Sequence, residues 1–297
     1  MSPSQPAGKT PDTRKIPRLA VSAGRGYLEA TGRPWATHRE AHTMTDAETA
    51  PTPRPAAVAV IGAGDYIGGA ICEAFAADGY RVFGGRRGGE KLAPLAAKIA
   101  AAGGRFEGRS LDARQVDQVA AFLEWADAEQ PLEAVIFNVG GNVNFPILET
   151  TERVFRKVWE MACEAGFFTG REAARLLLAR GGGSIFFTGA TASVRGGAGY
   201  AAFASAKAGL RALAQALARE LGPKNIHVAH LIIDAGVDTA FVRDRIAAAR
   251  GADALEALAP DTLMDPASIA RTYLTLHRQS RDAWTFELDL RPYGETW

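Results

Sequence analysis

The stretch AAVAVIGAGDYIGG, residues 56–69, decides how this chain folds. Residues 56–61 form a continuous apolar run, which is typical of a strand buried on both faces of a parallel sheet. A glycine-rich turn closes the run, and the apolar pattern over residues 67–78 is that of a helix. Strand, glycine turn and helix in this order predict the first unit of an open α/β sheet.

Six further strand candidates alternate with stretches of helical pattern. This alternation predicts an α/β fold in which helices cover both faces of a doubly wound parallel sheet. We therefore expect a Rossmann-like, seven-stranded, three-layer α/β/α domain over residues 56–297. The six further predicted strands are residues 81–84, 105–108, 134–138, 184–188, 227–233 and 284–288.

The first 55 residues differ in composition from the rest. They contain eight of the fifteen prolines in the chain and show no sustained apolar period. This composition predicts a disordered N-terminal extension over residues 1–55. The alternatives are a targeting segment and an upstream extension, residues 1–43, ahead of a natural start at Met44.

Composition excludes several classes of protein. The 34 lysines and arginines nearly balance the 33 aspartates and glutamates, so a net charge of +1 produces no field that would recruit nucleic acid or a membrane surface. Cys72 and Cys163 lack the spacing of a zinc site or a disulfide framework, so we expect no metal and a cytoplasmic location. No stretch reaches the roughly 18 apolar residues of a membrane span.

The glycine turn over residues 62–69 is the first candidate binding element. Glycines let the backbone approach a pyrophosphate, and the helix N-terminus that follows supplies free N–H groups. The second predicted strand leads into Arg86 and Arg87 and has no acidic residue at its end. An arginine there pairs with a 2′-phosphate, whereas a carboxylate binds the ribose hydroxyl of NAD. The sequence therefore favours NADP(H) over NAD(H), with two solvated arginines as the alternative.

Further motifs follow the glycine turn in a fixed order: Leu111-Asp112, Asn138-Val139-Gly140, Ala204-Ser205-Ala206-Lys207-Ala208 and Val237-Asp238-Thr239. With them, residues 56–290 resemble the short-chain dehydrogenase/reductase superfamily. The resemblance implies that the glycine turn lies at the pyrophosphate, Asp112 at the adenine and Lys207 at the nicotinamide ribose. Including the two arginines, the expected cofactor-binding residues are Gly62, Ile67, Gly68, Arg86, Arg87, Asp112, Asn138, Gly140, Lys207 and Thr239.

The catalytic positions of this family are mostly replaced. The family places tyrosine and lysine four residues apart on the long helix, where this chain has Phe203 and Lys207. The serine and asparagine of the family correspond to Ala190 and Cys163. Lys207 alone remains of the usual Asn/Ser/Tyr/Lys set, so the chain resembles an atypical member. The glycine turn departs too, because Tyr66 replaces a glycine and the neighbouring Asp65 adds a negative charge near the phosphates.

Tyr200 is the candidate replacement for the missing proton donor. It precedes Lys207 by seven residues, the spacing of enoyl-ACP reductases, a divergent branch of the same superfamily. Nearly two helical turns place Tyr200, Phe203 and Lys207 on one helix face. We therefore expect Lys207 and Tyr200 to be the catalytic residues, with packing at a helix start as the alternative for Tyr200.

Other polar residues near the expected site have two interpretations each. Asp234 and Asp238 are candidates for an acid/base pair or for loop anchors. His227 and His230 lie on a predicted strand and are expected to be packing or surface residues rather than acid/base groups. Three hydroxyl groups follow the fifth predicted strand and are candidates for oxyanion donors or turn caps: Thr188, Thr191 and Ser193.

These observations favour an NADP(H)-dependent oxidoreductase with a non-standard proton donor, acting on a carbonyl, an alcohol or an activated C=C bond of a small molecule. The alternatives are a cofactor-binding but catalytically inactive sensor or subunit, and a scaffold that has lost cofactor binding. Two long helices, about 151–179 and 199–221, resemble the pairing helices of the family and predict a homodimer or homotetramer. On a monomer, Leu210, Leu213 and Leu217 would be excess apolar surface.

Overall fold

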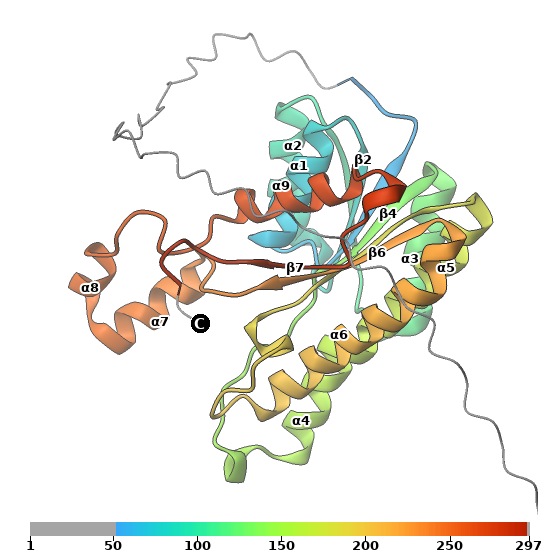
Figure 1. Ribbon diagram of the computed structural model, residues 1–297. Coiled ribbons are helices and arrows are strands. Elements are labelled where there is room, and N and C mark those ends of the chain that lie inside the picture. Colours follow the sequence, from blue (N-terminus) through green and yellow to red (C-terminus); the bar gives the residue numbers. More distant parts are fainter. Residues whose placement is uncertain (1–51, 296–297) are drawn as a thin grey trace, which may run out of the picture. The chain divides into compact units, whose positions relative to one another are not determined.

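The computed structural model describes residues 52–295, so most of the predicted N-terminal extension lies outside the described residues (Figure 1). Its centre is a seven-stranded sheet in the order β3-β2-β1-β4-β5-β6-β7, and every pair of neighbouring strands is parallel. The predicted doubly wound sheet is thereby confirmed. The strands are β1 (Ala57–Ile61), β2 (Arg81–Arg86), β3 (Arg105–Ser110), β4 (Leu132–Phe137), β5 (Gly183–Thr188), β6 (Ile226–Ile233) and β7 (Glu287–Leu290).

The central strand β1 shows why the apolar run is continuous rather than alternating. All five of its residues are buried. Ala57, Ala59 and Ile61 pack in the core on one face of the sheet, while Val58 and Val60 pack in the core on the other face. Because helices cover both faces, every position along the strand is apolar.

Helices form a layer on each face of the sheet (Figure 1). One layer contains α1 (Ile67–Ala77), α2 (Ala93–Ala101) and α9 (Pro266–His277). The other contains α3 (Val116–Glu129), α5 (Ala165–Arg180) and α6 (Ala201–Leu221). The chain changes direction across the sheet between β1 and β4, and an open α/β sheet binds ligands in the crevice outside the carboxyl ends of such strands.

The first of the two predicted long helices is continuous but contains a π-helical turn. It consists of α4 (Glu152–Trp159), a π-helical turn over Glu160–Glu164, and then α5. Such π turns within helices frequently occur at functional sites. The turn carries Cys163 and packs it against α6 at Gly209.

The leucine face of α6 lies inside the fold. Leu210 is completely buried against the core, and Leu213 and Leu217 are partly buried against the same core. The prediction that these leucines form surplus apolar surface is therefore wrong, because α6 uses this face to pack on the sheet and on α5. Exposed aromatic residues lie instead on α4 and α5, where Phe155 and Phe167 are each 42% exposed.

The last strand begins three residues later than predicted. Residues 284–288 were expected to be a strand, but β7 runs over Glu287–Leu290. Trp284 is outside the ladder because its ring stacks on His227, with ring centroids 4.9 Å apart, and its indole nitrogen donates to the Gln279 carbonyl oxygen at 3.3 Å.

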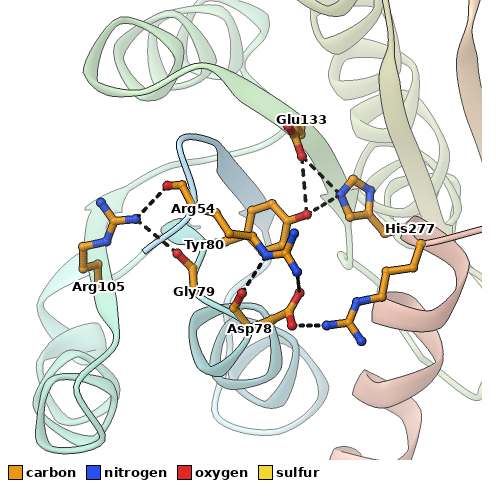
Figure 2. A network of polar contacts seen from close by, with 8 residues as sticks. Arg54, Asp78, Gly79, Tyr80, Arg105, Glu133 and His277 are labelled. Atoms are coloured by element: carbon orange, nitrogen blue, oxygen red, sulfur yellow. Dashed lines mark hydrogen bonds and ion pairs between the residues drawn. The ribbon is translucent and has the colours of Figure 1, made fainter. Parts of the chain in front are cut away.

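A network of polar contacts closes the amino edge of the sheet (Figure 2). The His277 ring contacts the Ser184 hydroxyl through Nδ1 at 2.9 Å and the Tyr80 hydroxyl through Nε2 at 3.1 Å. Tyr80 in turn donates to the Glu133 carboxylate at 3.4 Å. Burial and the Glu133 charge raise the pKa of Tyr80 to about 12, and the contact with His277 lowers the pKa of Glu133.

Two helices between β6 and α9 lie outside both layers. They are α7 (Ala240–Arg250) and α8 (Ala252–Glu256), and no residue of either is buried. Both project from the sheet at the end where β6 leads into α7 (Figure 1). Within residues 52–295, no helix combines the length and apolar character needed to cross a membrane.

Candidate active site

The glycine turn packs tightly against the end of β4. Gly62 has a φ of +94°, and a Cβ at this position would lie 2.6 Å from the carbonyl oxygen of Asn138. The Asn138 amide donates to the Gly62 carbonyl oxygen at 3.1 Å. Only glycine suits both the conformation and the contact. No side chain caps the N-terminus of α1, so the N–H groups of its first turn, beside Ile67 and Gly68 in the cavity lining, fit a pyrophosphate.

Asp65 and Tyr66, the two unusual residues of the turn, each have a partner. The Asp65 carboxylate pairs with Arg86 at 2.6 Å, which neutralises the charge expected to repel a phosphate. The Tyr66 hydroxyl accepts a hydrogen bond from the Ala240 N–H at 3.1 Å. Tyr66 thus connects the glycine turn to the start of α7.

A pocket of about 540 Å³ adjoins the glycine turn at the ends of β2 and β3. Its lining includes Arg87 and Lys91, which form no ion pair within residues 52–295. Asp112 also lines it, and a hydrogen bond from Arg114 lowers the pKa of Asp112. Since Arg86 is paired with an aspartate, Arg87 and Lys91 are the cations available to a phosphate group here.

The main cavity, of about 1290 Å³, lies at the carboxyl ends of the central strands. Lys207 of α6 is 3% exposed, and its ammonium group donates to the carbonyl oxygens of Thr188 at 2.8 Å and Val139 at 3.4 Å. Burial lowers the pKa of Lys207 to about 8. The ammonium group therefore lies between the ends of β4 and β5, beside the backbone of Gly140.

The three replaced catalytic positions lie in one apolar cluster. Phe203 and Cys163 are 7% and 8% exposed and belong to the same cluster as the partly buried Ala190. Burial, followed by the charge of Glu164, raises the pKa of the Cys163 thiol, so this side chain is a small hydrophobic group. An apolar wall therefore stands where the family has three polar side chains.

Tyr200 immediately precedes α6 and lines the same cavity as Phe203 and Lys207, as its spacing predicts. Arg245 of α7 donates to the phenolic oxygen of Tyr200 at 3.4 Å. Because the oxygen accepts this contact, the phenol retains its own proton for another acceptor. The Tyr200 hydroxyl thus belongs to the cavity lining, and its own O–H is not used in the contact with Arg245.

The hydroxyl groups after β5 are engaged within the fold. The Thr188 hydroxyl pairs with the Tyr273 hydroxyl at 2.6 Å. The Ser193 hydroxyl accepts from a backbone N–H three residues earlier at 3.1 Å, and Thr191 hydrogen-bonds the Asp234 carboxylate. Structural partners therefore account for all three hydroxyls.

Both candidate aspartates anchor loops. Asp234 is 1% exposed and pairs with Arg195 at 2.7 Å and Arg291 at 3.1 Å. Burial raises its pKa, but hydroxyl and guanidinium hydrogen bonds outweigh burial and hold the pKa of Asp234 below its ordinary value. Asp238 pairs with Arg243 at 2.7 Å. Neither carboxylate is free to act as an acid or base.

The two histidines of β6 are packing residues, as predicted. His227 stacks on a tryptophan ring and is 3% exposed. His230 is completely buried, its Nδ1 lies 3.1 Å from Glu287, and burial lowers the pKa of His230 to about 4.

The further candidates Ser193, Asp234 and Asp238 line neither of the two cavities. The expected catalytic and cofactor-binding residues each line at least one of them. Thr239, for example, lines the main cavity and caps α7 by accepting from the Val242 N–H at 3.1 Å. Sequence reasoning missed three arginines of the main cavity: Arg195, Arg245 and Arg250. Arg245 and Arg250 are five residues apart on α7. The sequence gives no sign that α7 lies beside the cavity, so their place in the lining is known only from the structure.

This combination of a doubly wound parallel sheet, an uncapped glycine turn and a cavity at the strand ends defines a dinucleotide-binding α/β protein. The family model for short chain dehydrogenases matches residues 56–249, and the chain belongs to this family. A solved short-chain dehydrogenase from Rhodopseudomonas palustris is 62% identical, with a TM-score of 0.70 over 81% of this chain and 100% of that chain.

Two more distant proteins extend the comparison. The 3-oxoacyl-[acyl-carrier-protein] reductase MabA of Mycobacterium tuberculosis is 29% identical over 63% of this chain and 71% of its own length. An alcohol dehydrogenase from the archaeon Thermococcus sibiricus, solved with 5-hydroxy-NADP, is 25% identical, with a TM-score of 0.69 over 81% of this chain and 98% of that chain. The chain is accordingly an NAD(P)-dependent oxidoreductase by family.

Proposed function

We propose that this oxidoreductase uses NADP(H) and interconverts a carbonyl and an alcohol, or reduces an activated C=C bond, with Tyr200 as its proton donor. The observation that carries the proposal is one cavity in which the glycine turn, Lys207 and Tyr200 meet. A cofactor that entered along the turn would place its reactive ring beside an ammonium group and a phenol, the two groups that this chemistry needs.

The choice of NADP(H) rests on the smaller pocket. Arg87 and Lys91 form no ion pair within residues 52–295, and the carboxylate whose charge interacts with Arg87 is that of Asp112 in the same pocket. The end of β2 carries no acid that would bind a ribose hydroxyl. Two unpaired cations match a 2′-phosphate. The Thermococcus enzyme was solved with an NADP derivative, which supports the same choice here.

Each side chain of the proposed site has a separate role in the reaction. The nicotinamide, when bound, supplies or accepts the hydride. The Lys207 ammonium holds the ribose hydroxyls, and Tyr200 donates its proton to the substrate oxygen as that oxygen becomes negative. The apolar wall around Phe203 excludes water from the reacting atoms.

The first experiment is a fluorescence titration of the full chain with NADPH and NADH, followed by a panel of small ketones, aldehydes and enones. We expect tight NADPH binding, weaker NADH binding and turnover of a carbonyl. Binding without turnover of any compound supports the inactive sensor or subunit instead. If neither cofactor binds, the proposal is contradicted, and the result supports the alternative of a scaffold that has lost cofactor binding.

The role of Tyr200 is tested by Tyr200→Phe, which removes one oxygen and keeps the ring. We expect kcat to fall by about 100-fold with an unchanged Kd for NADPH. Phe203→Tyr in the same variant supplies a phenol one helical turn nearer Lys207 and should recover part of the rate, which excludes misfolding as the cause. Unchanged turnover in Tyr200→Phe would contradict the assignment of Tyr200 as the proton donor.

Assembly through α4 and α5 is the remaining part of the proposal. Phe155, Trp159 and Phe167 are 42%, 39% and 42% exposed along this helical stretch, the first two about one turn apart and the third about two turns further on. Aromatic side chains grouped in this way mark an interface between subunits. Light scattering should give a dimer or tetramer, and Trp159→Glu should shift the mass toward the monomer.

A further inference from the structure

Two arginines of α7 line the main cavity without a carboxylate partner. Neither Arg245 nor Arg250 forms an ion pair within residues 52–295. The polar contact of Arg245 is with the Tyr200 hydroxyl at 3.4 Å. Arg243 of the same helix differs, because it pairs with Asp238 and does not line the cavity. Among the arginines of α7, the two that reach the cavity are thus the ones that form no ion pair within residues 52–295.

The other charged groups at the substrate end do not neutralise these arginines. Arg195 pairs with Asp234 at 2.7 Å, and Asp65 pairs with Arg86 at 2.6 Å. Glu295 is the other acid in the cavity lining, and it forms no ion pair within the described residues. One carboxylate against two guanidinium groups leaves an excess of positive charge at this end.

The rest of this end of the cavity is apolar. Val242, Ile246 and Ala249 line it from α7 at helical spacing, and Leu258 and Leu263 line it from the segment that follows. No residue of α7 is buried, and Val242, Ile246, Leu258 and Leu263 are only partly buried, so the protein covers these side chains incompletely. A ligand with an apolar body would cover them and gain the free energy of that burial.

We propose that the substrate is an apolar carbonyl compound with an anionic oxygen group, a carboxylate or a phosphate, which Arg245 and Arg250 bind. This inference rests on the proposed function and names its substrate class. In the reduction, the carbonyl carbon takes the hydride of the reduced cofactor, the carbonyl oxygen takes the Tyr200 proton, and the anionic group is unchanged. Because Arg245 touches Tyr200, binding of the anion and placement of the carbonyl are linked at one guanidinium.

Kinetics with matched substrates test the proposal. The full chain with NADPH is given a medium-chain oxo acid, the methyl ester of that acid, and an oxo-alkyl phosphate of equal length. We expect kcat/KM for one of the two anions to exceed that for the ester by about tenfold. Arg245→Gln should raise KM for that anion by about tenfold and leave KM for the ester within about twofold. Arg250→Gln should act in the same direction, and Arg243→Gln, the matched control, should not change either KM.

Binding without chemistry separates this inference from the proposed function. Thermal stabilisation of the protein by a saturated carboxylic acid and by an alkyl phosphate is measured with wild type, Arg245→Gln and Arg243→Gln. Anion binding that only Arg245→Gln loses supports the inference even if no carbonyl is reduced. Equal turnover of anions and ester, or equal loss of both in Arg245→Gln, overturns it while the oxidoreductase activity stands. The anion that stabilises the protein more shows whether the anionic group of the substrate is a carboxylate or a phosphate.

Discussion

The two edges of the sheet use their polar residues in opposite ways. At the amino edge, His277, Tyr80 and Glu133 pair with one another, and the network ties α9 to the strands (Figure 2). At the carboxyl edge, Lys207 and Arg245 line the cavity and have no carboxylate partner among the described residues. A polar group satisfied inside the fold stabilises the fold, whereas one left without a counter-charge in a cavity is available to a ligand.

The largest effect should come from breaking the amino edge. His277→Ala removes a ring whose side chain is 9% exposed, and it leaves the Ser184 and Tyr80 hydroxyls without this partner. We expect the free energy of unfolding, measured in urea, to fall by about 3 kcal/mol. The Kd for NADPH should not change. Thr275→Ala, at an exposed position of the same helix, is the control and should cost less than about 1 kcal/mol. Normal stability of His277→Ala would mean that the network does not stabilise the fold.

The converse change at the carboxyl edge is Lys207→Met. It removes a buried charge whose desolvation opposes folding, so the free energy of unfolding should change by less than about 1 kcal/mol. The Kd for NADPH should rise by about 30-fold, because the ammonium donor at the ribose is lost. Lys224→Met, an exposed position with the same change of charge, should bind NADPH normally. A Lys207→Met variant with a clearly lower free energy of unfolding and an unchanged Kd for NADPH would contradict the comparison between the two edges.

Arg87→Gln sharpens the comparison within the carboxyl edge. Removing one of two cations from the smaller pocket should weaken NADPH binding by about tenfold. NADH lacks the 2′-phosphate, so its Kd should stay constant and serves as the internal control. Equal weakening of both cofactors would show that Arg87 acts on a group that the two share.

The smallest expected effect is a pH dependence of cofactor binding. Burial lowers the pKa of Lys207 to about 8, so the ammonium form is lost as pH rises through that value. The Kd for NADPH should rise about threefold between roughly pH 7 and 9, and Lys207→Met should show no such rise. The free energy of unfolding should increase over the same pH range in which cofactor binding weakens. The unfolded chain binds the extra proton between the lowered and the ordinary pKa, so the Lys207 contribution to stability increases with pH across that window. A flat Kd in the wild type would contradict the charged role of Lys207.

Local pattern was sufficient for the sheet and for the gathering of the expected site residues around two adjoining cavities. The apolar run over residues 56–61 predicts a strand covered on both faces because the two cores require apolar side chains on each side of β1. The spacing of Tyr200, Phe203 and Lys207 predicts a shared helix face, and all three line one cavity. The local pattern gave a wrong result at two positions. It placed Trp284 in a strand, but the ring stacks on His227 outside the ladder. It placed Leu210 on an exposed face, but the side chain packs in the core.

The sequence by itself determined the fold class, the glycine turn and the loss of the usual catalytic residues, because each depends on residue type and on spacing within a few turns of chain. Only the tertiary structure decided which charges are paired. Asp65 meets Arg86, Asp234 meets Arg291, and Arg245 meets no carboxylate among the described residues. Ion pairs form across a few ångströms of space between segments far apart in the chain, so spacing along the sequence carries no information about them.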